Sequence, residues 1–294
     1  MIYNFFSALI FWLLFLIIPN ALYSQSIHFN IQEVKFKSQG VTLAGSILMP
    51  KKPFAAVVIV HGSDPVKREI EFAKLLAKEG IAVLTYDKRG VGESGGVYVG
   101  PSVGTNNIDT TNLNLLSQDA SAAITIFRTH LKTKNIPIGL IGFSQAGWII
   151  PLTAEKNQGV NFLVIFSGPV ITTLEQLRFQ FYTNGDEKFW DTHTDSVARE
   201  HIKNDPDRYQ FAETNPQMQL SKLTIPGLWI FGGKDIQVPV VVSMENLDKL
   251  KNLGKRYEYS LFPLLGHNTA FTESPEPVKV SVQWIKTMSK KRLN

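Results

Sequence analysis

Two hydrophobic periods alternate along this sequence, and their alternation restricts the fold more than any other feature. From Ile27 onward, short apolar or β-branched runs alternate with stretches in which apolar residues recur every three to four positions. The runs are typical of strands and the stretches of helices. Strands that alternate with helices favour a mostly parallel sheet with helices on both faces. We therefore predict a single α/β domain over residues 27–294.

The predicted elements begin with a hairpin, and the other strands are spread along the chain. The hairpin strands are expected at residues 27–37 and 41–49, and later strands at 55–60, 81–86, 138–143, 162–167, 227–231 and 257–261. Helices are expected at 68–79, 115–131, 144–155, 239–250 and 276–289. The run at 55–60 is continuously apolar, as expected for a strand that is buried on both faces of a parallel sheet.

One long segment, residues 169–222, interrupts this alternation. It separates two strands that should be neighbours, and it contains many aromatic residues among polar ones. A connection of this length in a compact fold is usually functional. We interpret it as a helical cap insert over the ends of the strands and not as a separate domain.

The N-terminal residues 1–26 carry no Lys, Arg, Asp or Glu. The apolar run from Phe5 to Ile18 has the length of a signal-peptide core and is short for a membrane span, which needs about 20 residues. The small residues Ser24 and Ser26 predict cleavage near Ser26 and export to the periplasm or the medium. The segment lacks an N-terminal Lys or Arg, so an uncleaved anchor is the alternative, and it would be the only membrane contact.

Composition excludes several classes of function. The chain has 30 Lys and Arg against 25 Asp and Glu, a net charge of +5, but both signs are interspersed, and we expect no nucleic-acid partner. The absence of Cys excludes disulfides, thiolate zinc sites and a Cys nucleophile. Nothing in the sequence indicates a metal or an organic cofactor, and it leaves the oligomeric state open.

The sharpest local signal is the hexapeptide from Gly142 to Gly147, which lies between an apolar strand and a helix. A strand, a sharp turn and a helix in this order hold a central serine in a strained conformation with its hydroxyl above the sheet. Small residues beside the serine keep the strand and the helix apart, although Ala146 stands where glycine is common. We predict Ser144 as a nucleophile; an ordinary turn serine is the alternative.

A serine nucleophile needs a base, and the base needs a partner that fixes its tautomer. Asp235 follows the strand at 227–231, and His267 lies in a loop after the strand at 257–261. Catalytic groups gather at such carboxyl ends in an open α/β sheet. We therefore predict Asp235 as the acid and His267 as the base. A turn residue without a catalytic role is the alternative for Asp235.

The other titratable side chains suit these roles less well. Glu245, on the following helix, is a distant second candidate for the acid. Asp119 and Glu155 are expected to be solvated charges on helix faces. Four histidines in polar or exposed contexts are expected to have no catalytic role: His28, His130, His193 and His201.

Acyl transfer also needs N–H donors for an oxyanion. The backbone N–H of Gln145, directly after the serine, is the first predicted donor. The second is expected in the loop after the strand at 55–60, from Ser63 or, as the alternative, from Gly62. His61 in this loop is predicted to orient it through ring hydrogen bonds. A tight turn that binds nothing is the alternative for the whole loop.

Together these motifs resemble the α/β-hydrolase superfamily, and the resemblance covers residues 27–294. The loop from His61 to Pro65 with Arg68, the run from Asp87 to Ser94 and the serine elbow carry it. They are similar to the bacterial esterase, acyl-thioesterase-like and serine-aminopeptidase-like branch, in which Gly is often found at the position of Asp64. The resemblance implies that Asp87 and Arg89 support the loops near the oxyanion hole. A phosphate-binding loop is the competing interpretation of that run, but its Gly-Lys-Ser/Thr ending is missing.

The resemblance also implies a cofactor-free enzyme that transfers an acyl group through Ser144. A carboxylic ester hydrolase acting on small or medium acyl esters is expected, with a thioesterase or a peptidase for short peptides as alternatives. A peptidase needs a cap carboxylate that binds the substrate amine, and the candidates are Glu175, Asp186, Glu187 and Asp191. A non-catalytic binding protein with the same fold is the third hypothesis.

Overall fold

The computed structural model describes residues 28–100, 107–132, 135–206 and 209–293. The signal peptide predicted for residues 1–26 lies outside these residues. One eight-stranded sheet forms the centre of the molecule, with the strand order β1-β2-β4-β3-β5-β6-β7-β8. Of the helices in the described ranges, none is long and apolar enough to cross a membrane.

The sheet is antiparallel at one edge and parallel elsewhere, which confirms the predicted architecture. The strands β1 (Phe29–Ser38) and β2 (Val41–Pro50) form the predicted hairpin, and β2 pairs antiparallel with β4 (Ile81–Tyr86). The remaining neighbours are parallel: β3 (Ala55–Val60), β5 (Ile138–Phe143), β6 (Phe162–Phe166), β7 (Gly227–Gly232) and β8 (Tyr257–Phe262). Every residue of the strands β3, β4, β5, β6 and β7 is buried, because helices cover both faces.

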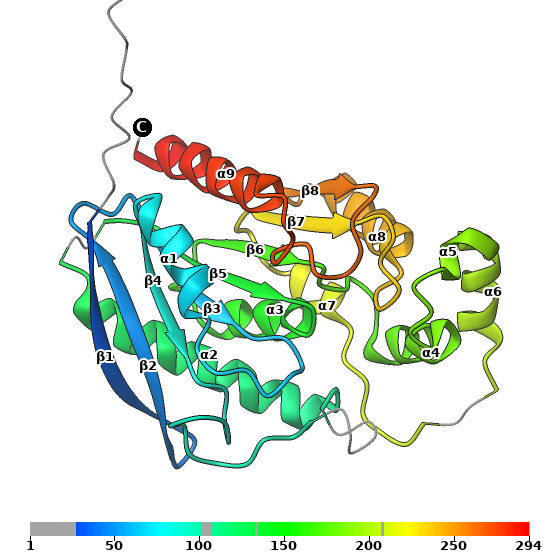
Figure 1. Cartoon of the computed structure of the whole chain (residues 1–294), viewed down its shortest axis with the longest axis horizontal. Helices are drawn as coiled ribbons and strands as arrows, with labels where there is room; N and C mark the ends of the chain where they lie inside the picture. Colours follow the sequence, from blue (N-terminus) through cyan, green and yellow to red (C-terminus); the bar gives the residue numbers. More distant parts are fainter. Residues whose placement is uncertain (1–27, 101–106, 133–134, 207–208, 294) are drawn as a thin grey trace, which may run out of the picture.

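Two apolar cores lie on the two faces of this sheet. On one face α1 (Ile70–Lys78) and α9 (Glu276–Leu293) pack on the strands (Figure 1). On the other face lie α2 (Thr110–His130), α3 (Ala146–Lys156) and α8 (Val240–Asn252). Successive residues of β3 point to opposite cores, so that Ile59 packs on the first face and Val58 on the second.

The helix α2 begins at Thr110, five residues before its predicted start. The side chain of Asp109 accepts a hydrogen bond from the backbone N–H of Thr111 and so caps the first turn. The apolar periodicity begins only further along the helix, so the pattern alone placed the start too late. A cap residue is therefore the better guide to this boundary.

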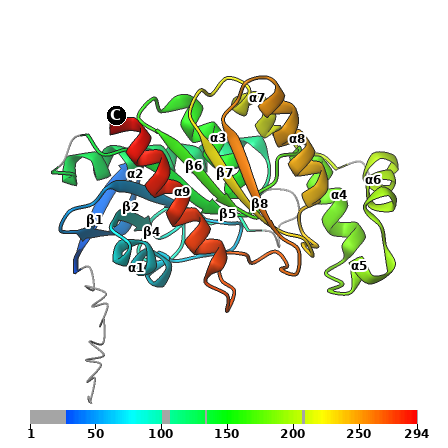
Figure 2. The same cartoon turned by 90° about the horizontal axis from the view of Figure 1, so that it is seen from above.

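The long segment 169–222 divides into two parts. The helices α4 (Thr173–Thr183), α5 (Phe189–Thr192) and α6 (Asp195–Asn204) stand together beyond the carboxyl ends of the parallel strands (Figures 1 and 2), and we call these three helices the cap. They share a small apolar core of their own around Phe179 and Phe189. The fourth helix, α7 (Pro216–Leu220), instead contacts α3 and α8, and its Leu220 belongs to the main core.

Asp119 is buried, and the expectation of a solvated charge at this position is wrong. Its carboxylate accepts hydrogen bonds from Nε of Arg89 at 2.9 Å, from Nη2 of the same side chain and from the Ser38 hydroxyl at 2.5 Å. It shares the inner face of α2 with Leu116 and Ala120, which the helical period could have indicated. This ion pair anchors the run after β4 to α2, in agreement with the supporting role implied for Arg89.

We expect Asp119→Ala to lower the free energy of unfolding by about 3–5 kcal/mol, because it leaves the buried guanidinium of Arg89 without its partner. Glu155→Ala is the matched control, since Glu155 pairs with Lys222 at 2.6 Å on the surface and such pairs contribute about 0–1 kcal/mol. Denaturant titration of both variants measures the difference. Equal small losses of unfolding free energy in the two variants would contradict a buried ion pair between Asp119 and Arg89.

Candidate active site

Ser144 lies at the sharp turn between β5 and α3. Its backbone φ is 49°, in the left-handed region that residues with a side chain rarely adopt. Its N–H donates to the carbonyl oxygen of Phe166 at 2.9 Å, and its own carbonyl accepts from the N–H of Gly147 at 2.8 Å. These bonds stabilise a conformation that costs about 1–3 kcal/mol. Among the described residues the Ser144 hydroxyl has no hydrogen-bond partner, so it is available for chemistry.

The elbow closes tightly because Gly142 has no side chain. A Cβ atom at Gly142 would lie 2.5 Å from Cβ of Ala146 and 2.6 Å from the carbonyl oxygen of Val60, closer than such atoms pack. The methyl group of Ala146 occupies the space that Gly142 leaves. Alanine can therefore stand where glycine is common without separating the strand from the helix.

Asp235 and His267 are brought together from the ends of β7 and β8. Nδ1 of His267 lies 2.8 Å from Oδ2 of Asp235. The other carboxylate oxygen, Oδ1, accepts the backbone N–H groups of Gln237 at 2.7 Å and Val238 at 2.9 Å. The Asp235 side chain is fully buried and the His267 side chain is 10% exposed. A carboxylate held in this way fixes the proton of the imidazole on Nδ1 and leaves Nε2 to act as a base.

Glycines at the end of β7 allow the loop with the base, residues 263–271, to lie directly on the loop with the acid. A Cβ atom at Gly232 would lie 2.1 Å from the carbonyl oxygen of Gly266, and one at Gly233 would lie 2.7 Å from that of Pro263. Any side chain at these two positions would push the loops apart. The contact between the acid and the base therefore depends on this close approach.

The same loop, 263–271, is anchored beside the nucleophile. The hydroxyl of Thr269 lies 2.8 Å from that of Ser167, at the end of β6. The ring of Phe271 packs on the ring of Phe143, the residue before Ser144, with 4.8 Å between their centroids. No hydrogen bond joins the Ser144 hydroxyl to the imidazole within the described ranges. In serine enzymes this bond often forms fully only with substrate in place.

The loop after β3 lies on the other side of the nucleophile. A Cβ atom at Gly62 would lie 3.7 Å from Cβ of Ser144. The preceding His61 is buried, and Nε2 of its ring bonds to the carbonyl oxygen of Tyr86. Burial lowers the pKa of His61 to about 4, so the ring is neutral and donates to this carbonyl. His61 thus orients the loop through one ring nitrogen.

Asp87 and Arg68 tie this loop to the run after β4. The Asp87 carboxylate accepts the backbone N–H of Arg68 at 2.8 Å and two guanidinium N–H groups at 3.1 Å. It also accepts the N–H of Glu93 at 2.8 Å. Burial disfavours the charged form of Asp87, but the hydrogen bonds from Arg68 outweigh it and lower the pKa of Asp87. Asp87 therefore stays ionised and supports the loop, the role that the resemblance implied.

Lys88 is the residue of this site that sequence analysis did not single out. Its side chain is buried, with the residue only 3% exposed. Its Nζ lies 2.6 Å from the carbonyl oxygen of Gly62, 2.9 Å from that of Ser63 and 3.2 Å from Oε1 of Gln145. The signal in the sequence was its place two residues after a buried strand, at the edge of the sheet where site residues gather.

The two residues with the predicted oxyanion donors, Gln145 and Ser63, both bond to this ammonium group through other atoms. The buried side chain of Gln145 accepts from Lys88 through Oε1 and donates from Nε2 to the carbonyl oxygen of Asn107 at 2.6 Å. In the part of the chain that the structure describes, the backbone N–H groups of Gln145 and Ser63 have no hydrogen-bond partner. Both are therefore available to a negatively charged oxygen near Ser144.

The cap holds the loop that carries the acid. Three side chains of the cap donate to three consecutive carbonyls: Trp190 to Asp235 at 2.8 Å, Thr183 to Ile236 at 2.7 Å and Gln176 to Gln237 at 3.1 Å. In a trans peptide the carbonyl points away from the following N–H. The N–H groups of Gln237 and Val238 therefore face inward, onto the Asp235 carboxylate. The cap is thus part of the support of the acid.

Comparison with known proteins agrees with this geometry. The family described as serine aminopeptidase, S33, matches residues 51–199, just over half of the chain. The chain belongs to this family. The matched range contains the loop after β3, the serine elbow and most of the cap. Asp235 and His267 lie beyond it, so their pairing rests on the structure alone.

Similar proteins include both esterases and peptidases. The esterase EstD of Thermotoga maritima is 28% identical over 237 residues, which is 69% of this chain and 53% of that protein, so the chain spans about half the length of this curated relative. An esterase structure from Pyrococcus furiosus has a TM-score of 0.64 and 19% identity over 88% of this chain and 91% of its own. The acylaminoacyl peptidase of Pyrococcus horikoshii has a TM-score of 0.62 and 17% identity, and the match covers 89% of this chain and 41% of the peptidase chain. These structures confirm the α/β-hydrolase fold.

The other side chains that the sequence offered as acids or bases have partners away from Ser144. Glu245, the second candidate for the acid, forms two hydrogen bonds of 2.8 Å with the guanidinium of Arg199 on α6. In the cap, His193 stacks on Phe189 and His201 stacks on Tyr182. None of these groups contacts Ser144 within the described residues, and none competes with Asp235 and His267.

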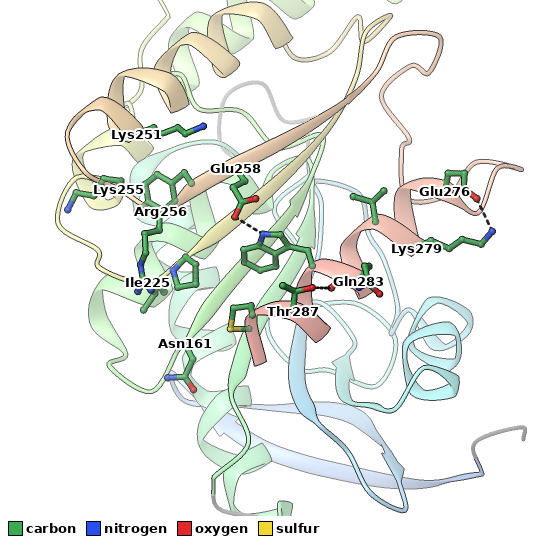
Figure 3. A pocket seen from close by; sticks show the side chains of 15 residues that line it. Asn161, Ile225, Lys251, Lys255, Arg256, Glu258, Glu276, Lys279, Gln283 and Thr287 are labelled. Atoms are coloured by element: carbon green, nitrogen blue, oxygen red, sulfur yellow. Dashed lines mark hydrogen bonds and ion pairs between the residues drawn. The ribbon is translucent and has the colours of Figure 1, made fainter. Parts of the chain in front are cut away.

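A groove of about 1180 Å³ lies at the opposite end of the sheet (Figure 3). It is formed by α9 and by the residues at the amino ends of β7 and β8, and Trp284 lines it and donates to Glu258 at 3.0 Å. Its lining contains neither the serine elbow nor the acid and the base. We therefore place the active site at the carboxyl ends of the strands and not in this groove.

We expect Asp235→Asn to lower kcat by about 10⁴-fold, because an amide in place of the carboxylate favours the wrong imidazole tautomer. Glu245→Gln is the matched control and should leave kcat within about twofold, since among the described residues Glu245 bonds to Arg199 on the surface of the cap. Steady-state kinetics on an ester substrate measures both variants. A larger loss in the Glu245 variant than in the Asp235 variant would reverse the assignment of the acid.

Proposed function

We propose that this chain is a serine hydrolase that cleaves carboxylic esters through an acyl-enzyme on Ser144. The observation that carries the proposal is the paired Asp235 and His267 at the same edge of the sheet as the strained serine elbow. Membership of a serine hydrolase family and similarity to the esterase EstD support it. The proposal needs no metal and no organic cofactor.

The chemistry divides into two acyl transfers. In the first, the Ser144 oxygen attacks the ester carbonyl carbon while Nε2 of His267 takes its proton, and the imidazolium then gives this proton to the departing alcohol. In the second, His267 takes a proton from water, the hydroxide attacks the acyl-enzyme, and the carboxylic acid leaves as the proton returns to Ser144. Asp235 stabilises the imidazolium in both steps. The N–H groups of Gln145 and Ser63 stabilise the oxyanion.

The cap favours an ester over a peptide with a free amine. A peptidase would need an available carboxylate there, but Glu175 forms a capping box with Thr172 at the start of α4. Asp186, Glu187 and Asp191 are exposed, Asp186 accepts the backbone N–H of Lys188 at 2.9 Å, and no bond among the described residues directs any of the three toward Ser144. The family description keeps short peptides as the second candidate substrate.

We expect purified protein to hydrolyse p-nitrophenyl esters and to be labelled by a fluorophosphonate at Ser144. Turnover of aminoacyl-p-nitroanilides should be at least about tenfold slower, because the cap carboxylates are engaged or point into solvent. Ser144→Ala should lower ester turnover by about 10⁴–10⁶-fold, the cost of losing a serine nucleophile. Faster anilide turnover would favour the peptidase. A Ser144→Ala variant equal to wild type would favour the non-catalytic binding protein.

We also propose that residues 1–26 direct export and are removed near Ser26. The charge-free apolar run between Phe5 and Ile18 supports this, since it is too short for a typical span. Expression of the full chain followed by fractionation and mass spectrometry of the N-terminus tests it. We expect the exported protein to begin near Ile27. An intact N-terminus in the membrane fraction would show the anchor instead.

A further inference from the structure

The Lys88 ammonium group is a buried cation at the centre of the site, yet neither acyl-transfer step uses it. We propose that Lys88 is the positioning residue of the oxyanion hole, because its ammonium group turns the peptides of the loop after β3 so that their N–H groups face Ser144. The inference rests on the proposed serine hydrolase activity. It adds a residue that makes no contact with the reacting atoms.

The direction of the peptides follows from the hydrogen bonds of Lys88. The carbonyl of Gly62 points at Nζ, at 2.6 Å, and the peptide between Gly62 and Ser63 is trans. The N–H of Ser63 therefore points to the side away from Lys88. The carbonyl of Ser63 is held by Lys88 at 2.9 Å and by the Tyr98 hydroxyl at 2.7 Å, which directs the N–H of Asp64 in the same manner.

The loop with the acid provides an observed case of the same geometry. There, side chains of the cap hold the carbonyls of Ile236 and Gln237, and the N–H groups of the same peptides converge on the Asp235 carboxylate. In the loop after β3, the two carbonyls are held by Lys88 and the corresponding N–H groups have no protein acceptor in the described residues. A developing oxyanion is the group that such donors suit.

Lys88 also fixes the distance between the two donors. Its backbone N–H donates to the carbonyl of Val66 at 3.1 Å, and its ammonium donates to Oε1 of Gln145 at 3.2 Å. The first bond holds the loop after β3 and the second holds the residue after the nucleophile. One residue therefore connects the two halves of the hole, through its backbone N–H and its side chain.

The charge of Lys88 is essential to this arrangement. An ammonium group has three N–H donors, and its nearest acceptors are the carbonyl oxygens of Gly62 and Ser63 and Oε1 of Gln145, with the carbonyl oxygen of Asp64 farther away at 3.5 Å. A neutral amine keeps two donors and turns a lone pair toward the third oxygen, which repels it. Loss of the proton therefore releases at least one of the three oxygens and loosens the hole.

The surroundings of Lys88 place this loss of a proton near neutral pH. Burial lowers the pKa of Lys88 to about 7, and the Asp64 carboxylate opposes this shift. The other titratable groups around it do not compensate: His61 is neutral, the Tyr98 ring lies 5.4 Å from Nζ with its pKa raised by burial, and the Asp87 carboxylate is bound by a guanidinium. The hole is thus intact below this pH and loosens above it.

The test compares Lys88→Met and Lys88→Arg with wild type, and Lys67→Met, an exposed residue of the same loop, is the matched control. We expect Lys88→Met to lower kcat and the rate of fluorophosphonate labelling of Ser144 by about 10–10³-fold with KM within about threefold, because an oxyanion hole acts in the transition state. The control should match wild type.

In wild type, kcat should fall above about pH 7. Lys88→Arg keeps its proton, so its kcat should not fall in this range.

Labelling separates the failure of this inference from that of the proposed function. No labelling of Ser144 in wild type would reject the serine hydrolase itself. Thermal unfolding shows whether Lys88→Met is folded. If the folded variant is labelled and turns over substrate at the wild-type rates, the role of Lys88 is rejected and the serine hydrolase activity stands. If that variant does not fold, Lys88→Gln takes its place, since an amide keeps two N–H donors but carries no charge, and wild-type labelling and kcat in that folded variant also reject the role.

Discussion

The opposed directions of the carbonyl and the N–H in each trans peptide control how this site is built. When the carbonyls of a short loop are held on one side, its N–H groups face a charged atom on the other side. In the loop with the acid, the cap side chains Trp190, Thr183 and Gln176 hold them. In the loop after β3, Lys88 holds them. Both ends of the site therefore depend on side chains outside the reacting set of Ser144, Asp235 and His267.

The sheet supplies the rigidity that these loops need. Five strands are buried on both faces, so their carboxyl ends have fixed positions and the loops that follow start from fixed points. The strained turn at Ser144 persists because its N–H and its carbonyl are bonded to Phe166 and Gly147. Close approach at Gly142 and Gly232 then leaves little space for the elbow or the acid loop to move. Strain at the nucleophile is thus offset by the packing around it.

The elements and the three reacting side chains could be predicted from the sequence because their signals are local. Strand runs, the serine elbow and a carboxylate or a histidine directly after a strand are all visible within about ten residues. Asp119 and Lys88 were missed for the opposite reason. Their partners, Arg89 and the loop with Gly62, are distant in sequence, so the local signals, an inner helix face for Asp119 and a position after a strand for Lys88, do not show that the charge is paired. The division of segment 169–222 at α7 likewise depends on distant contacts.

The bonds between the cap and the acid loop have a consequence for specificity. In a fold with an independent cap, a change of substrate size would alter binding and leave the acid in place. Here the indole of Trp190 is bonded to the main chain of Asp235 itself. Any movement of α5 that widens the site must stretch or break this bond, and with it the orientation of the acid that fixes the imidazole. The aromatic core that joins α4, α5 and α6 spreads such a movement over the whole cap. We therefore expect substrate selection and turnover to be linked, so that substitutions in the cap core change kcat as well as KM.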